Sequence, residues 1–131
     1  MIYVSFFKGE AGRHICSLDP VTLESRRLCD MPQCSHLMSN HNGSWVVGDG
    51  CGAVGDLASR KPGQEETDPY LHLFDIHTGT TRAVARHDSS WRVYKGNRQV
   101  THPHPSFTPD MQQVLYSSDC DGEPAIFLAD L

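Results

Sequence analysis

One pattern recurs at a regular distance along this chain, an alternating apolar stretch that ends in an aspartate. It occupies residues 15–19, 71–75 and 126–130, and a threonine-containing turn follows the first two copies. Asp19 and Asp75 are 56 residues apart, and Asp75 and Asp130 are 55 apart. Alternation with a period of two is typical of β-strands, and a constant spacing predicts repeated structural units. We expect the three aspartates to cap hairpins through Asx-type hydrogen bonds.

The rest of the sequence also favours strands over helices. No apolar pattern of the i, i+3, i+4 kind is sustained, and short β-branched and aromatic runs are separated by Gly, Asp, Asn and Pro clusters. We therefore expect an all-β fold in which the strands follow one another as hairpins. The expected strands are residues 2–7, 14–19, 25–29, 44–48, 70–76, 81–86, 113–118 and 125–129.

The repeat has the layout of a β-propeller blade, in which a hairpin closes on an Asp-x-x-Thr-Gly turn. A second shared element, a turn and strand followed by small residues and an aspartate, occurs at residues 39–49 and 107–119. A blade usually takes about 40–45 residues, so the longer spacing here predicts an insertion of about ten residues in each unit. These insertions, at residues 51–69 and 87–105, are where functional residues are expected.

The length of the chain limits how much of a propeller it can form. A complete propeller needs at least about four blades, whereas this chain supplies about two and a half to three. We expect residues 1–131 to form one partial β-propeller domain that is part of a larger ring.

Charge and cysteine content narrow the class of partner and the compartment. The formal net charge is -5, which argues against a nucleic-acid or membrane-surface partner because polyanions are bound chiefly through Lys and Arg. No apolar run approaches the roughly 20 residues that span a bilayer. The five cysteines form no CxxC pair and accompany no signal-like apolar run. We expect a reduced, cytoplasmic setting.

The most informative local feature is the sequence His102-Pro-His104-Pro. Residues two apart in an extended chain project to the same side, and the prolines exclude a helix, so both imidazoles are expected together. Gln99 can add an oxygen ligand, and His36 precedes the inner strand of the preceding blade, near the same end of the propeller axis. These four residues are candidate ligands of a divalent metal ion. Exposed histidines are the alternative interpretation, and the spacing does not name the ion.

Three residues of the second insertion are candidates for contacts with a ligand. Trp91 could stack on a ring of the ligand, and its alternative role is packing in the core or at the rim. Arg92 and Arg98 could form bidentate pairs with carboxylates, and their alternative is a solvated surface position.

An ordered series of motifs over nearly the whole chain resembles the C-terminal portion of the oligogalacturonate lyase family. The series runs through Met38-Ser-Asn40, Val46-Val-Gly-Asp-Gly50, Leu73-Phe-Asp75, Thr78-Gly79, His87-Asp-Ser-Ser-Trp91, Gln99-Val-Thr-His-Pro-His-Pro-Ser-Phe-Thr-Pro-Asp110 and Val114-Leu-Tyr-Ser-Ser-Asp119. The resemblance implies a seven-bladed propeller that holds Mn²⁺ through three histidines and one glutamine. On the matching motif these are Gln99, His102 and His104, with His36 as the third histidine and His87 as its competitor.

The resemblance also implies a reaction. Lyases of this family act on short, digalacturonate-like acidic oligosaccharides in the degradation of pectin, and they cleave them by β-elimination, which gives unsaturated uronates. A cation on the uronate carboxylate neutralises charge and acidifies the neighbouring C–H bond, and a neutral histidine is a suitable base. In the family that histidine and an assisting arginine lie upstream of the matched region. Arg13 and His14 have no motif support for this role, so no catalytic base is assigned.

Two other functions remain open at this point. A non-catalytic propeller segment of the TolB or WD-like kind would serve protein contacts, and it predicts no metal. A small metal-dependent hydrolase would use His36, His102 and His104 to activate water, but no carboxylate base lies at motif spacing.

Overall fold

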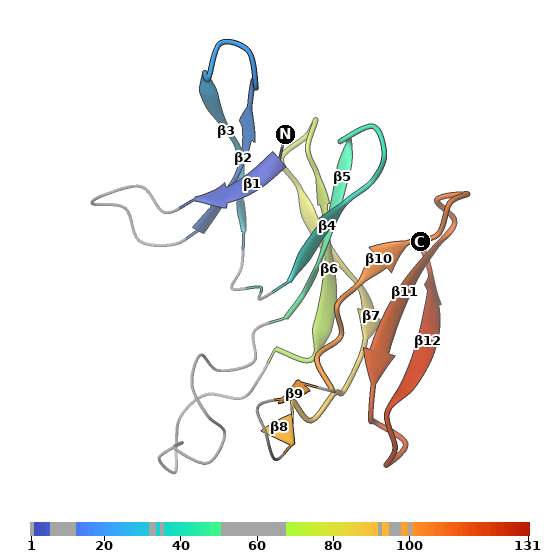
Figure 1. Ribbon diagram of the computed structural model, residues 1–131. Coiled ribbons are helices and arrows are strands. Elements are labelled where there is room, and N and C mark those ends of the chain that lie inside the picture. Colours follow the sequence, from blue (N-terminus) through green and yellow to red (C-terminus); the bar gives the residue numbers. More distant parts are fainter. Residues whose placement is uncertain are drawn as a thin grey trace.

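The computed structural model describes residues 2–5, 13–31, 34, 36–50, 68–91, 93–94, 98–99 and 101–131. All regular structure within these ranges is β, as Figure 1 shows, so the predicted all-β class is confirmed. The strands are β1 (Ile2–Ser5), β2 (Arg13–Leu18), β3 (Ser25–Met31), β4 (Leu37–Ser39), β5 (Trp45–Asp49), β6 (Tyr70–Asp75), β7 (Thr81–Arg86), β8 (Val93–Tyr94), β9 (Arg98–Gln99), β10 (Ser106–Phe107), β11 (Gln113–Ser118) and β12 (Ala125–Asp130).

The strands form antiparallel sheets in which neighbours in the sequence are also neighbours in space. The orders are β1-β2-β3, β4-β5-β6-β7 and β10-β11-β12, and β8 and β9 form a separate hairpin. Where the four-stranded sheet meets the β10-β11-β12 sheet, β4 lies against β10 and β7 lies against β12. First strands therefore meet first strands and last strands meet last strands, which is the arrangement of successive propeller blades. The predicted propeller blades are confirmed, and within the described residues one has four strands and two have three.

The two central strands of the four-stranded sheet, β5 and β6, are buried on both of their faces. Val46 and Phe74 are paired across β5 and β6, and they pack with buried residues of β2 and β3. Val47 and Leu73 form the next pair, and they pack with Val114 of β11. Successive residues of a strand point to opposite faces. The period-two pattern read from the sequence thus sends one set of side chains toward each neighbouring sheet.

Two of the three predicted aspartate caps are confirmed. In both Asp19 and Asp75, Oδ1 accepts hydrogen bonds from the backbone N–H groups two and three residues later, at 2.8 and 3.1 Å. These backbone hydrogen bonds stabilise the charged carboxylates and lower the pKa of each. The prediction was wrong for Asp130, which lies within β12 and accepts a hydrogen bond from Nε2 of Gln113 at 2.8 Å.

The eight predicted strands all occur, with bounds that differ from the prediction by at most two residues. The strands β4, β8, β9 and β10 were not predicted, because two or three residues are too few to show an alternating pattern. Most of the first predicted insertion, residues 51–67, lies outside the described residues. Among the residues that are described, there is no helix that could cross a membrane.

Candidate metal centre

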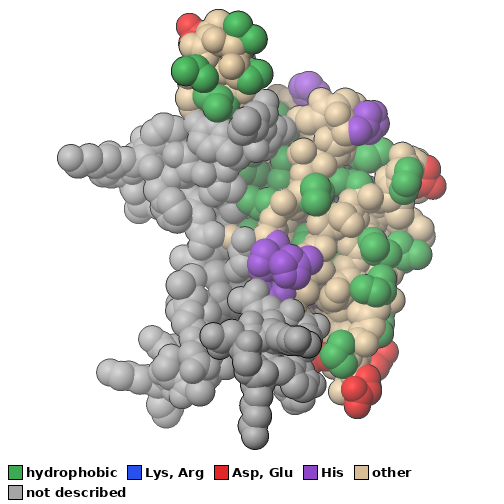
Figure 2. Space-filling model, viewed as in Figure 1, with side chains coloured by type: hydrophobic (Ala, Val, Ile, Leu, Met, Phe, Trp, Pro, Cys, Tyr) green, Lys and Arg blue, Asp and Glu red, His purple; other side chains and the backbone are tan. Residues whose placement is uncertain are grey.

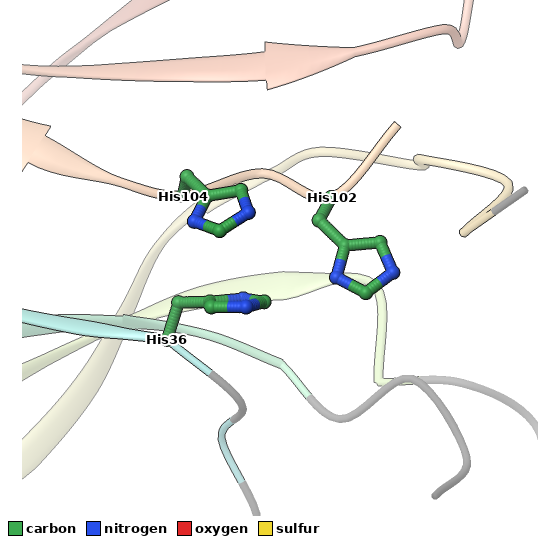
Figure 3. Close-up of side chains that lie close together, drawn as sticks. All are labelled: His36, His102 and His104. Atoms are coloured by element: carbon green, nitrogen blue, oxygen red, sulfur yellow. The ribbon is translucent and has the colours of Figure 1, made fainter. Parts of the chain in front are cut away.

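Three histidines from two neighbouring blades meet at one place. His36 lies directly before β4, and His102 and His104 lie in the segment that leads into β10 (Figure 3). One ligand nitrogen from each ring lies within 4.8 Å of the other two. The ring of His36 is 3.7 Å from that of His104 and 5.2 Å from that of His102, measured between centroids. Histidine side chains gather at the surface near the middle of the face in Figure 2.

The segment that carries His102 and His104 is held by β11. Pro103 is fully buried between the two histidines, and its carbonyl accepts a hydrogen bond from the backbone N–H of Ser117 at 2.8 Å. The expectation of an extended segment needs correction at His104, whose φ of 46° is left-handed. This region is uncommon for a residue other than glycine. The backbone therefore turns at His104, and both imidazoles still face His36 (Figure 3).

The electrostatic environment favours neutral imidazoles. Burial lowers the pKa of His102 and of His104, and the neighbouring His36 ring lowers both further. Only a neutral imidazole has a lone pair with which to bind a metal ion. The protein therefore holds these two rings in the form that a metal ligand requires.

An unsatisfied nitrogen tests whether the residues fit a metal ion. Nδ1 of His102 is buried and has no hydrogen-bond partner, and an unpaired buried polar atom is costly unless another partner satisfies it. Two imidazole nitrogens that bind one ion at about 2.1 Å lie at most about 4.2 Å apart. Closing the observed span of 4.8 Å thus needs only a small movement of the rings. The three histidines fit a divalent cation in both chemistry and distance.

His87, the competitor for the third histidine position, does not join this group. It is 1% exposed, and its Nδ1 accepts a hydrogen bond from the backbone N–H of Ser89 at 3.0 Å. The ring of Trp91 lies edge-on to the rings of both His87 and His102, with centroid distances of 5.7 Å and 4.7 Å. Of the two histidines considered, the structure brings His36 to His102.

The other predicted site residues are placed as follows. Trp91 is only 3% exposed, so the structure favours packing, its alternative role, and sugar stacking by this ring stays an untested prediction. Arg98 and Gln99 form β9, but their side chains lie outside the described part of the chain. Arg92 lies outside the described residues altogether. The ligand role of Gln99 and the substrate contacts of both arginines therefore stay predictions.

Two carboxylates near the histidines were missed in the sequence. Asp49 ends β5 and contacts His36, and its Oδ1 accepts the backbone N–H of that histidine at 2.7 Å. Asp119 follows β11, and its Oδ1 accepts the backbone N–H of Ser90 at 2.7 Å, next to Trp91. Both aspartates occupy the same position in the sequence of the second repeated element, directly after its small residues. That shared position was the available signal in the sequence. Each of the two carboxylates holds a backbone segment of the site region by a hydrogen bond, Asp49 at His36 and Asp119 at Ser90.

Burial of His87 predicts a dependence of stability on pH. Desolvation lowers the pKa of His87 in the folded chain, whereas an unfolded histidine titrates near 6.5. Below about pH 6.5 the unfolded chain therefore binds the extra proton, and the folded chain loses stability until the folded pKa is reached. We expect His87→Gln, which keeps an acceptor for the Ser89 N–H, to lose less stability between pH 7.5 and 5 than the unchanged chain. Urea unfolding at both pH values checks this, and an identical pH dependence would contradict it.

Comparison with known proteins places the chain in a family. A sequence model of the oligogalacturonate lyase family matches residues 1–131. The chain is 54% identical over 129 residues to the oligogalacturonate lyase of Dickeya dadantii and, equally, to the oligogalacturonide lyase of Pectobacterium atrosepticum. Each match covers 98% of this chain and 33% of the relative. The chain thus spans about a third of the length of these curated relatives.

Solved structures agree. An oligogalacturonate lyase in complex with manganese superposes with a TM-score of 0.82 and 53% identity, over 99% of this chain and 31% of that one. The oligogalacturonate lyase of Vibrio parahaemolyticus gives a TM-score of 0.85 and 46% identity, over 98% and 32%. TolB of Acinetobacter baumannii, at 16% identity and a TM-score of 0.64 over 99% and 26%, shares the fold alone. The chain belongs to the oligogalacturonate lyase family.

Proposed function

We propose that this chain supplies the metal-binding part of an oligogalacturonate lyase site. The observation that carries the proposal is the convergence of His36, His102 and His104, from two blades, within 4.8 Å. The solved relative that contains manganese supports Mn²⁺ as the ion. Gln99, at the end of β9 and three residues before His102, is proposed as the fourth ligand.

The proposed reaction is β-elimination in short, acidic oligogalacturonides of pectin, which gives an unsaturated uronate. When bound, Mn²⁺ supplies positive charge to the uronate carboxylate and so acidifies the adjacent C5–H bond. The part of this chain is to hold neutral imidazoles toward one point and to leave room for a substrate carboxylate. Arg92 and Arg98 are proposed to pair with further carboxylates of the oligosaccharide. The proton-abstracting base is not assigned to a residue.

The geometry favours this proposal over the two alternatives. A propeller segment that serves only protein contacts has no need for three converging imidazoles. It also has no need for the lowered pKa of His102 and His104, or for the hydrogen bond that fixes Nδ1 of His36. For a hydrolase, the sequence offers no carboxylate base at motif spacing, and the carboxylate that lies beside the histidines, Asp49, is buried and hydrogen-bonded to His36 through both oxygens. We also propose a reducing, cytoplasmic location, which is consistent with a sequence of five cysteines that contains no CxxC pair.

A titration of the chain with MnCl₂, followed by incubation with digalacturonate, tests the proposal. We expect saturable Mn²⁺ binding. Growth of the absorbance of an unsaturated uronate would place the base within this chain as well, whereas binding without turnover would place it elsewhere. A chain that does not bind Mn²⁺ would sink the proposal.

A further inference from the structure

A fully buried carboxylate makes two hydrogen bonds to one of the three histidines. Asp49 is 0% exposed, and its Oδ1 accepts the backbone N–H of His36 at 2.7 Å. Its Oδ2 lies 2.7 Å from Nδ1 of the His36 ring. The backbone N–H of Asp49 in turn donates to the carbonyl of His36 at 3.1 Å. These contacts fix the backbone and the ring of the same residue.

The position of the carboxylate is itself set by close packing on either side of it. A side chain at Gly48 would meet Cδ2 of Leu37 at 2.7 Å and Sγ of Cys34 at 3.1 Å. A side chain at Gly50 would collide with the backbone oxygen of Asp68. The backbone is therefore closely packed before and after Asp49, and the Asp49 side chain is itself fully buried. Its two hydrogen bonds to His36 orient the ring from this packed position.

The hydrogen bond determines which nitrogen of His36 is available. An ionised carboxylate only accepts hydrogen bonds, so Nδ1 of His36 must carry a hydrogen. In the neutral ring the lone pair is then on Nε2, and the ring faces His104 at 3.7 Å. Histidine ligands of metal ions are commonly fixed in this way by a carboxylate on the other nitrogen.

We infer that Asp49 is the positioning residue of the metal centre, holding the His36 ring in place and keeping Nε2 free of hydrogen so that it can bind the divalent ion. This inference rests on the proposed function of His36 as a metal ligand. It assigns a task to a carboxylate outside the group of three histidines, and it makes the tautomer of one histidine the property that Asp49 controls.

Asparagine at position 49 separates this role from simple filling of space. The side chain has the same shape, but one of its two polar atoms is an NH₂ group that only donates. If its oxygen keeps the hydrogen bond from the His36 backbone, its NH₂ faces Nδ1, which must then accept. The ring hydrogen moves to Nε2, and the proposed ligand atom is blocked. The opposite orientation of the amide directs its NH₂ at the backbone N–H of His36, which leaves two donors facing each other.

Two measurements on the full chain test the inference. In the metal-free chain, ¹⁵N NMR of the His36 ring is expected to show hydrogen on Nδ1, and in Asp49→Asn it is expected to show hydrogen on Nε2. Titration with MnCl₂ is expected to show an affinity lowered by about 10- to 100-fold in Asp49→Asn. Asp75→Asn is the matched control, since Asp75 caps an exposed turn at the opposite end of the β5–β6 pairing from Asp49, and it should leave both readouts unchanged.

The possible results separate this inference from the proposed function. If the unchanged chain binds Mn²⁺ and Asp49→Asn binds it equally well, the inference fails while the proposed function stands. Hydrogen on Nε2 of His36 in the unchanged, metal-free chain would overturn the inference by itself. This test does not depend on whether Asp49→Asn folds. A failure of the unchanged chain to bind Mn²⁺ would overturn the proposed function and, with it, the role of Asp49.

Discussion

Replacing His102 with alanine is expected to lower the affinity of the chain for Mn²⁺ by more than about 100-fold. Mutation of a residue that only hydrogen-bonds to a metal ligand already lowers metal affinity by about 10- to 100-fold, and here the ligand itself is lost. His102 offers a buried nitrogen with no hydrogen-bond partner, and it faces His36 and His104. Its removal leaves two of the three converging imidazoles. Calorimetric titration with MnCl₂ measures the difference directly.

His77→Ala is the matched control for this experiment. His77 is exposed in the turn after β6, and its hydrogen bond to Asp75 is made by its backbone and not by its ring. The control should bind Mn²⁺ as the unchanged chain does. Equal affinity in the His102 and His77 variants would mean that any bound ion lies elsewhere.

Replacing Phe74 with alanine is expected to reduce the free energy of unfolding by about 3–5 kcal/mol, since a buried aromatic ring is lost and a cavity remains. Phe74 is 0% exposed and packs with Ile15 and Val46, where the first two sheets meet. Chemical denaturation followed by circular dichroism gives the difference.

The control for this stability measurement is Val21→Ala, at a turn residue that is 88% exposed. A substitution at such a position should change the free energy of unfolding by less than about 0.5 kcal/mol. A similarly small change for Phe74→Ala would show that the first two sheets do not share the core described above.

Much of the fold was predictable because its signals are local and periodic. Strand alternation indicated the eight longer strands, and the repeated aspartates indicated the hairpin turns at Asp19 and Asp75. The strands of two or three residues carry too little sequence to show a period, so only hydrogen bonding to their neighbours reveals them. Asp130 resembled the other two aspartates in sequence but is paired across the sheet with Gln113.

The candidate site was predictable to the extent that it lies in one sequence motif. The spacing of His102 and His104 indicated a shared direction, and the place of His36 before an inner strand indicated the same end of the propeller. The left-handed backbone of His104 was not predictable, because it depends on how Pro103 is held by β11. The contact between Asp49 and His36 also depends on strand register, which sequence spacing does not determine.

The central claim is that His36, His102 and His104 form one metal centre. It is tested most directly by X-ray diffraction from crystals of the chain grown in the presence of MnCl₂. An anomalous difference map recorded at the manganese absorption edge locates the ion without reference to any assumed ligand. We predict a peak between the three rings, within bonding distance of a nitrogen from each. A manganese peak at other residues, with these three rings free of metal, would contradict the account.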